Sequence, residues 1–165
     1  MPEGQQCSEL VSLTDLFAIA TRAAGVLETR DGIDVIGLLK NQAETRTRLI
    51  GMYGIPGTPR FKVMLRHAKW KYIFIANGGR ELLFNLEDDP DELQDRSRSR
   101  PDVAEDLKRQ LEEMLAEHPN SARALDRGEL ISFPFEARAL RRIIQMDTSQ
   151  GITGFPQSPG NLLET

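Results

Sequence analysis

Hydrophobic side chains recur with a helical spacing near the start of the chain. They are Leu13, Leu16, Phe17, Ala20 and Ala24, which fall on one face of a helix. Ser12 and Asp15 fit a capping box at the start of this stretch, and Gly25 is placed to end it. The pattern predicts a short amphipathic helix, followed by one or two more helical turns over 35–39 despite Gly37.

A second helical stripe lies after the middle of the chain. Pro101 stands where a helix tolerates proline, in its first turn. The apolar positions that follow are Val103, Leu107, Leu111, Met114 and Leu115. Their spacing predicts one amphipathic helix that ends near His118. Beyond it, only a short helix around 137–144 is indicated, followed by a polar segment rich in glycine and proline.

Between the two helical stripes the apolar pattern has a period of two, which is typical of strands. Phe61, Val63 and Leu65 begin the alternation, and the run 70–75 is rich in aromatic and β-branched residues. Asn77, Gly78 and Gly79 form a turn signal, because these residues tolerate positive φ. With returning residues 82–86 and a possible edge strand at 49–53, the pattern predicts a small antiparallel sheet.

Both faces of the strand at 70–75 carry apolar side chains. Trp70, Tyr72 and Phe74 point to one face, whereas Ile73 and Ile75 point to the other. The predicted long helix can pack on one of these faces, and no segment of this chain is evident that would cover the other. An aromatic row at this spacing is typical of a hydrophobic core. If Trp70 belongs to the core, Trp70→Ala should destabilise the chain by about 3–5 kcal/mol. A near-neutral effect on stability would instead favour a role for these rings in stacking on a sugar.

Charge and cysteine content narrow the classes of partner. The 165 residues carry a net charge of −4, which gives no field to attract nucleic acid or anionic membranes. Cys7 is the only cysteine, so no internal disulfide is expected. The first residues lack the pattern of a signal peptide, and no run is long enough to span a bilayer. A cytoplasmic protein is expected if Met1 is the native start; otherwise the true beginning is missing.

The sequence contains no recognisable motif that would pair the candidate catalytic groups with a metal or with other catalytic residues. The acidic run 87–95 has Pro90 at its centre instead of the glycine of a calcium loop, and it predicts a turn. Glycines 51, 54 and 57 lack the lysine of a phosphate-binding loop. His67 and His118 fall at predicted element ends with no metal or triad partner. No catalytic residue and no metal ligand is therefore assigned.

Four segments, in order along the chain, resemble the type I sulfatases of the alkaline-phosphatase superfamily. They are VSLTDLFAIATRAAGV at 11–26, DGIDVIGLL at 31–39, WKYI at 70–73 and ELLFNLEDDPDEL at 81–93. The resemblance implies the C-terminal part of such an enzyme, with an α+β fold. Residues 1–45 would be the last helices of the large α/β domain. Residues 46–118 would form a four-stranded antiparallel sheet packed by a C-terminal helix, and residues 119–165 would form an extended tail.

The catalytic groups of that family do not map onto this chain. The complete enzymes use a formylglycine, made within C-x-P-x-R or its serine equivalent, together with calcium or magnesium. Cys7 lacks the proline of that motif, and the motifs starting at Ser99 and Ser132 have Val103 and Glu136 in place of the arginine. The chain is accordingly expected to be inactive alone.

The resemblance leads to a structural expectation for this chain. It would complete the large domain and shape the rim of the substrate pocket, with Tyr53 and Arg60 as the rim residues to test. The expected partner is the missing N-terminal domain or another protein on the uncovered sheet face, and a homo-oligomer is an alternative cover. Two other hypotheses stay open: a freestanding noncatalytic interaction module, and part of a phosphoryl or phosphonate ester hydrolase of the same superfamily.

Overall fold

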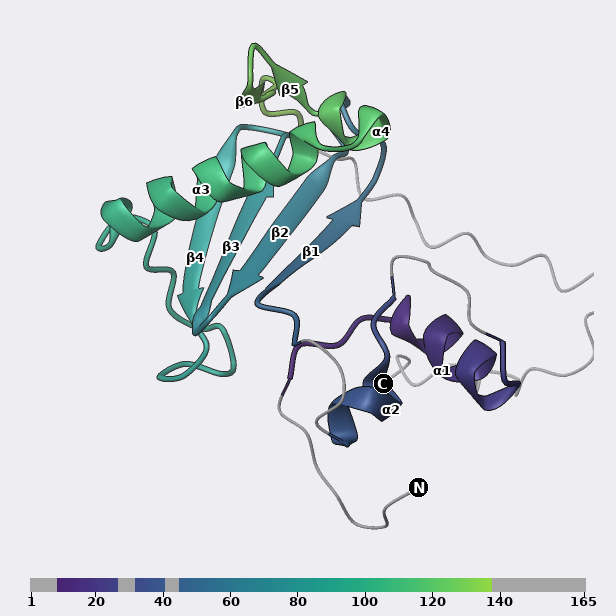
Figure 1. The fold of residues 1–165 in the computed structure, drawn as a ribbon. Coiled ribbons are helices and arrows are strands. Elements are labelled where there is room, and N and C mark those ends of the chain that lie inside the picture. The colour runs from purple at the N-terminus through teal and green to yellow at the C-terminus, as the bar shows by residue number, and fades with distance from the viewer. Residues whose placement is uncertain (1–8, 27–31, 41–44, 138–165) are drawn as a thin grey trace, which may run out of the picture.

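An antiparallel sheet with one long helix packed across it forms the centre of the structure (Figure 1). The computed structural model describes residues 9–26, 32–40 and 45–137. The four strands lie in chain order: β1 (Arg48–Tyr53), β2 (Lys62–His67), β3 (Trp70–Ile75) and β4 (Arg80–Asn85). Helix α3 (Pro101–Ala116) contacts β2, β3 and β4. The predicted α+β class and the four-stranded sheet are confirmed.

Tight turns set the register of the strands. His67 pairs with Trp70 across the turn between β2 and β3, and Ala68 within it has a φ of 49°. Gly78 and Gly79, between β3 and β4, have φ values of 86° and 58°. Glycine adopts such angles at little cost, so the turn predicted from Asn-Gly-Gly is confirmed.

The core lies between α3 and one face of the sheet. Its largest fully buried side chains include Tyr72, Phe61, Leu65, Leu83, Leu111, Leu115 and Val63. The predicted stripe of α3 is therefore a packing surface, with Val103 and Met114 at its partly buried margin. Trp70 is also only partly buried, and the cations of Lys69 and Arg100 approach its ring. Trp70→Ala should consequently destabilise the chain less than removal of a fully buried aromatic ring would.

Two short helices precede the sheet and lie beyond one end of β1 in Figure 1. Helix α1 (Asp15–Ala23) and α2 (Val35–Leu39) pack against each other, and Arg22 forms an ion pair with Asp34. Both predicted helices are confirmed. The apolar side of α1 is nevertheless open to solvent, since Leu16 is 59% exposed and Leu13, just before the helix, is 84% exposed.

Asp15 anchors the start of α1 and is almost completely buried. Its carboxylate accepts hydrogen bonds from the backbone N–H groups of Ser12 and Ile33, at 2.6 and 2.9 Å. The first contact is the carboxylate half of the predicted capping box. The second fastens the segment before α2 to α1. None of the helices in the described part of the chain is both long and apolar enough to cross a membrane.

Residues 119–137 fold back onto the sheet and helix instead of extending away as a tail. They form α4 (Pro119–Ala122) and a hairpin of β5 (Leu125–Asp126) and β6 (Glu129–Leu130). Ala124 and Leu130 belong to the same core as α3. The short helix expected around 137–144 lies outside the described residues apart from Ala137. The division of the chain into three parts stays a prediction.

Candidate functional site

The sheet has a second face, opposite α3, which we call the outer face. It consists of Leu49, Gly51, Tyr53, Lys62, Met64, Arg66, Lys71, Ile73, Ile75, Arg80, Leu82 and Phe84, which pair across neighbouring strands. Met64, Ile73, Ile75 and Leu82 form its apolar centre, and each stays partly exposed. The strand pattern that predicted apolar side chains on both faces is confirmed, and within the described residues this centre lies outside the α3 core.

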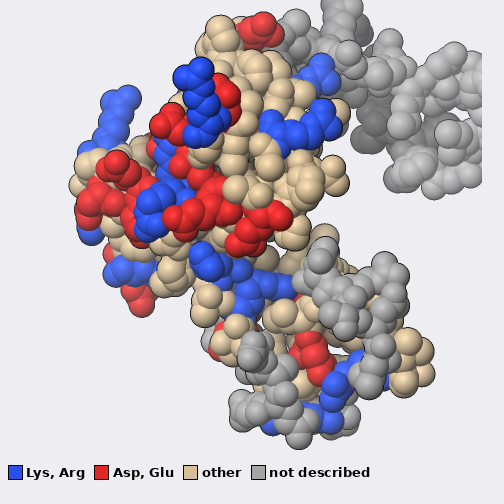
Figure 2. Space-filling model, turned by 45° about the horizontal axis from the view of Figure 1, so that its top comes forward, with Lys and Arg blue, Asp and Glu red and all other residues tan. Residues whose placement is uncertain are grey.

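Every charged side chain that these strands place on the outer face is basic. Lys62, Arg66, Lys71 and Arg80 lie there, and the strands contribute no acidic residue to that side. The chain as a whole has a net charge of −4. Figure 2 shows the contrasting surface over α3, where acidic and basic side chains are mixed. The outer face therefore combines an apolar centre with a positive margin.

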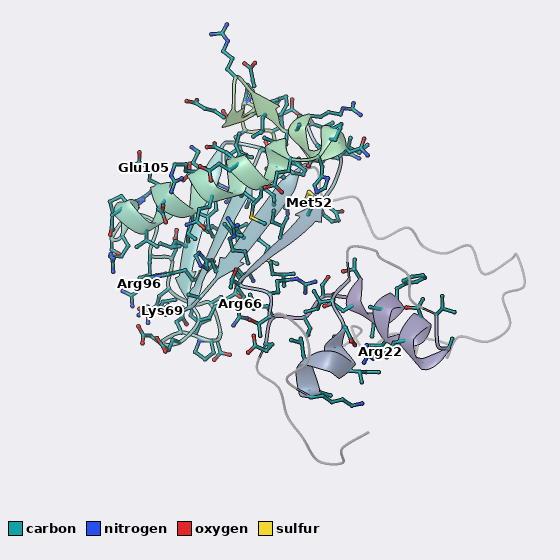
Figure 3. The ribbon with its side chains drawn as sticks, in the orientation of Figure 1. Arg22, Met52, Arg66, Lys69, Arg96 and Glu105 are labelled. Carbon is teal, nitrogen blue, oxygen red and sulfur yellow. The ribbon has the colours of Figure 1, made fainter. Side chains whose placement is uncertain are left out.

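The loop between β4 and α3 closes one end of this face. Lys71 forms an ion pair with Glu92 of that loop at 2.7 Å, and Phe84 is buried beside it. The carboxylate of Asp89 accepts hydrogen bonds from the backbone N–H groups of Leu93 and Gln94. Figure 3 shows Arg66 and Arg96 at this end of the sheet. The acidic run therefore forms a turn, and its carboxylates fix the conformation of the loop through hydrogen bonds and an ion pair.

A pocket of about 800 Å³ lies at the opposite end of the outer face. Its lining includes Tyr53 and Arg60, the two side chains that the sequence indicated for a substrate rim. Lys62, Arg80 and Phe135 join them from β2, β4 and the segment after β6. Neither Arg60, Lys62 nor Arg80 forms an ion pair within the described part of the chain. The role of Tyr53 and Arg60 at a rim stays a prediction.

The loop between β1 and β2 forms one wall of the pocket and is tightly packed. A Cβ atom on Gly54 would lie 2.6 Å from the carbonyl oxygen of Arg60, and one on Gly57 would lie 2.5 Å from that of Arg123. The Thr58 hydroxyl donates to the carbonyl oxygen of Ile55 at 2.7 Å. The loop that carries Arg60 is therefore held both internally and against the segment after α4.

The segment after β6 forms the facing wall, because it pairs with the turn between β3 and β4. Phe133 donates its N–H to the carbonyl oxygen of Ala76, and Gly78 donates to that of Phe133, both at 2.9 Å. The side chain of Asn77 donates to the carbonyl oxygen of Glu136 at 2.9 Å and accepts from its N–H at 2.8 Å. These four hydrogen bonds, which we call the latch, bring Phe135 to the pocket.

Metal-binding geometry is absent from the described ranges. No three His, Cys, Asp or Glu side chains come together there in a group that could hold a metal ion. The calcium or magnesium ion implied by the resemblance thus has no candidate ligand set among them, and the residues present do not fit it.

Comparison with solved structures identifies the architecture. One neighbour is described as a candidate sulfatase from Bacteroides thetaiotaomicron VPI-5482, with a TM-score of 0.57 and 15% identity over 72% of this chain. A second is described as a 2-O GAG sulfatase, with a TM-score of 0.57 and 16% identity over 72% of this chain. This is a sulfatase-like fold. No family model and no curated protein sequence matches the chain.

The chain spans only about a quarter of the sulfatase-like structures it matches. It covers 27% of each of those two chains. A third neighbour, solved in complex with its substrate D-glucosamine-2-N,6-O-disulfate, has a TM-score of 0.52 and 18% identity. Here the match covers 65% of this chain and 25% of the other. The expected sulfatase resemblance is confirmed for the fold, and these partial matches are consistent with a C-terminal part.

Three members of the pocket lining were not evident from the sequence. Lys62 and Arg80 lie at the ends of strands, and a period-two pattern does not say which strand ends meet. Phe135 follows a hairpin of two-residue strands, too short to give a periodic signal. The Gly128 turn, with φ of 91° and 52° at Gly128 and Arg127, was the available signal for that hairpin.

Proposed function

We propose that this chain is the C-terminal part of a sulfatase-like sulfuric ester hydrolase. In this role it completes the large α/β domain and contributes Tyr53 and Arg60 to the rim of the substrate pocket. Activity belongs to the complete protein, because the nucleophile and the cation site of the family have no counterpart in this sequence. The sulfatase-like fold and its partial coverage of the neighbouring structures support the proposal.

The observation that carries the proposal is the outer face. A sheet face with an apolar centre gains stability when a second surface removes it from water, by roughly 25 cal/mol per Å² of apolar area. Met64, Ile73 and Leu82 keep part of that area exposed in this chain. The missing α/β domain is the proposed cover, and its contact surface would be apolar in the middle and acidic opposite Lys62 and Arg80.

Helix α1 supports the same assignment independently. Leu16 in this helix and Leu13 just before it are exposed and lie on one amphipathic stripe, and such stripes normally face a core. In the proposed complete protein, this stripe packs inside the α/β domain from which α1 comes. Two separate apolar surfaces then receive their cover from one missing unit.

The size of the native protein in its source cells tests the proposal. An antibody raised against residues 69–93 should detect a band several times larger than the 18.6 kDa of this chain. A band at 18.6 kDa would contradict the proposal, since the cell would then make the short form. That outcome would favour a freestanding interaction module with its partner on the outer face. A blot after partial proteolysis controls for a short band produced by cleavage.

A further inference from the structure

The loop between β4 and α3 covers one edge of the four-stranded sheet. Arg96 donates its N–H to the carbonyl oxygen of Leu83 at 2.7 Å, and the Asp95 carboxylate accepts from the Leu83 N–H at 3.0 Å. Asp89 donates its N–H to the carbonyl oxygen of Asn85 at 2.8 Å. The outward backbone groups at the middle and end of β4 therefore have partners within the chain.

The opposite edge, on β1, has no such cover in the described part of the chain. Ala76 donates its N–H to the carbonyl oxygen of Phe61 at 3.1 Å, which shows which residues of β2 bond to β3. Successive residues of an antiparallel strand bond to alternate sides, so three residues of β1 turn their backbone groups away from β2. They are Arg48, Ile50 and Met52. No described residue forms a hydrogen bond with these outward groups.

The sequence of β1 does not protect this edge. Natural proteins protect open edges with proline, bulges, charged side chains or very short strands. Strand β1 has six residues, contains no proline and pairs with β2 without a bulge. Its one charged residue, Arg48, stands at the first position. A regular edge of this length offers a continuous row of donors and acceptors to another strand.

Exposed apolar side chains gather at the same edge. Met52, Tyr53 and Ile55 are 55%, 64% and 63% exposed. Helix α3 lies over β2, β3 and β4, so Ile50 on this side of the sheet is only partly buried. Figure 3 shows Met52 at this margin of the sheet. Apolar side chains grouped in this way are typical of a surface that another protein covers.

We propose that β1 pairs antiparallel with β1 of a second copy of this chain, which joins the two sheets into one. The twofold axis passes through Gly51. In this register Ile50 of each copy lies opposite Met52 of the other, and Leu49 lies opposite Tyr53. Every one of these cross-strand pairs is apolar, and such pairs stabilise a sheet. The same patch serves both copies, as a twofold interface requires.

The side chains favour this register over the neighbouring one. An axis through Ile50 would also bring the outward backbone groups together, but it would place Arg48 opposite Met52. It would also place Thr47 opposite Tyr53. The axis through Gly51 avoids both mismatches. Glycine at the axis, moreover, leaves no pair of side chains to clash where the two copies come closest.

The charges at the two ends of β1 are complementary across the proposed axis. The axis brings Arg48 of one copy to the end of β1 in the other. That end lies near α4, which follows α3, because a Cβ on Gly57 would meet the carbonyl oxygen of Arg123 (Figure 1). The last turn of α3 contains no basic residue, and Glu117 after it is exposed. The C-terminal end of a helix attracts a cation, so this end of each copy suits the arginine of the other.

The first measurement is the mass of the full chain in solution as its concentration rises. Pairing of two short strands buries less than the roughly 1,200 Å² of a standard interface, so a weak dimer is expected. Sedimentation between about 1 and 500 µM spans the range of such a weak dimer. A species of twice 18.6 kDa should appear as the concentration rises. A monomer at every concentration would overturn the proposal.

Amide exchange followed by NMR locates the contact. The N–H groups of Ile50 and Met52 should exchange more slowly as the dimer forms, because they become hydrogen-bonded across the axis. The N–H of Leu83 at the β4 edge is the reference, since Asp95 already binds it and its exchange should not change. A dimer without added protection at Ile50 and Met52 would overturn the proposal and place the contact elsewhere, for example on the outer face.

Matched variants separate the β1 edge from general stickiness. Met52→Lys places two new charges in each dimer and should weaken it at least about tenfold. Leu93→Lys is the control, because Leu93 is 81% exposed and lies in the loop before α3. Equal weakening by both variants would overturn the proposal. Far-UV circular dichroism checks that each variant is folded.

A further variant tests whether the outer face could form the dimer instead. Ile73→Thr/Leu82→Thr removes apolar area from that face and leaves β1 unchanged. This variant should lose larger species and keep the dimer with its protected Ile50 and Met52. Loss of the dimer in this variant would overturn the proposal.

The results are independent of the sulfatase assignment. A monomeric chain with a large native band would remove the dimer alone. A dimer with a native band at 18.6 kDa would keep the β1 interface and remove the sulfatase assignment.

Discussion

Arg46 holds the buried carboxylate of Asp15 with both of its terminal nitrogens. The distances are 2.9 Å from Nη1 to Oδ2 and 2.8 Å from Nη2 to Oδ1. The two side chains are 14% and 2% exposed, so water screens the pair little. Arg46 lies two residues before β1, and Asp15 begins α1, so this pair joins the helical part of the chain to the sheet.

The first prediction concerns the pH dependence of this pair. The Arg46 hydrogen bonds lower the pKa of Asp15 from 3.8 to about 2. Because the folded-state pKa lies below the unfolded value, the stabilisation is fully present above about pH 4 and is lost as pH falls towards 2. The shift corresponds to roughly 2 kcal/mol. Asp15→Asn should therefore be less stable than the wild type at pH 7, as measured by urea unfolding.

The same comparison at low pH is decisive. Protonation makes the wild-type side chain neutral, so its difference in unfolding free energy from Asp15→Asn should shrink between pH 4 and pH 2. A difference that stays constant over this range would show that charge plays no part. Asp91→Asn, at an exposed position in the loop before α3, provides the control and should change little at any pH.

The second prediction separates the ring of Tyr72 from its hydroxyl. The side chain is fully buried, and its hydroxyl has no hydrogen bond of normal geometry in the described structure. Burial raises the pKa of Tyr72 far above its usual range, and the carboxylate of Glu81 adds to the effect. Tyr72→Ala should cost about 3–5 kcal/mol because it leaves a cavity. Tyr72→Phe should be near neutral, since no strong hydrogen bond is lost.

Chemical denaturation followed by Trp70 fluorescence measures both variants, because Trp70 lies two residues away on the same face of β3. A large loss in Tyr72→Phe would mean that the hydroxyl contributes a hydrogen bond, for example through water. Trp70→Ala offers a comparison at a partly buried ring, and it should cost less than Tyr72→Ala. Because Trp70 is the only tryptophan of the chain, the unfolding of this variant is followed by far-UV circular dichroism.

The third prediction concerns the loop that carries Arg60. Gly57 has a φ of 76°, and a Cβ atom there would meet the carbonyl oxygen of Arg123 at 2.5 Å. Gly128 also has a positive φ, of 91°, but no atom lies within 4 Å of its Cβ position. Gly128→Ala should therefore cost on the order of 1–2 kcal/mol from backbone strain alone. Gly57→Ala should cost clearly more in thermal unfolding; equal costs would contradict the close packing of this loop.

The sequence predicted the structure best where two elements with a periodic apolar pattern pack against each other. The alternation at Phe61, Val63 and Leu65 and the stripe of α3 predicted a sheet and a helix that pack together, and they form the core. Local patterns do not report contacts between distant residues. Asp15 was predicted as a cap, and its main partner, Arg46, lies 31 positions away. The pocket depends likewise on Asn77 and Glu136, which are 59 positions apart.

Helix α1 illustrates a different limit. Its apolar stripe predicted a helix correctly, but a stripe records only that some surface covers it. Leu13 and Leu16 are exposed here, so the covering surface is not in the described part of this chain. The period of a pattern gives the element, whereas the identity of its cover depends on tertiary structure.

The last prediction tests which apolar surface dominates the behaviour of the isolated chain. The centre of the outer face joins β2, β3 and β4 into one patch, and exposed patches of this kind bind hydrophobic dyes and promote association. Replacing Ile73 and Leu82 together by threonine keeps a residue suited to a strand while removing apolar area. This double variant should bind less dye and associate less in sedimentation than the wild type. The matched comparison is Leu13→Thr/Leu16→Thr, with Leu16 in α1 and Leu13 just before it. A loss of dye binding confined to that variant would place the dye-binding surface at α1 and exclude the outer face as the docking site.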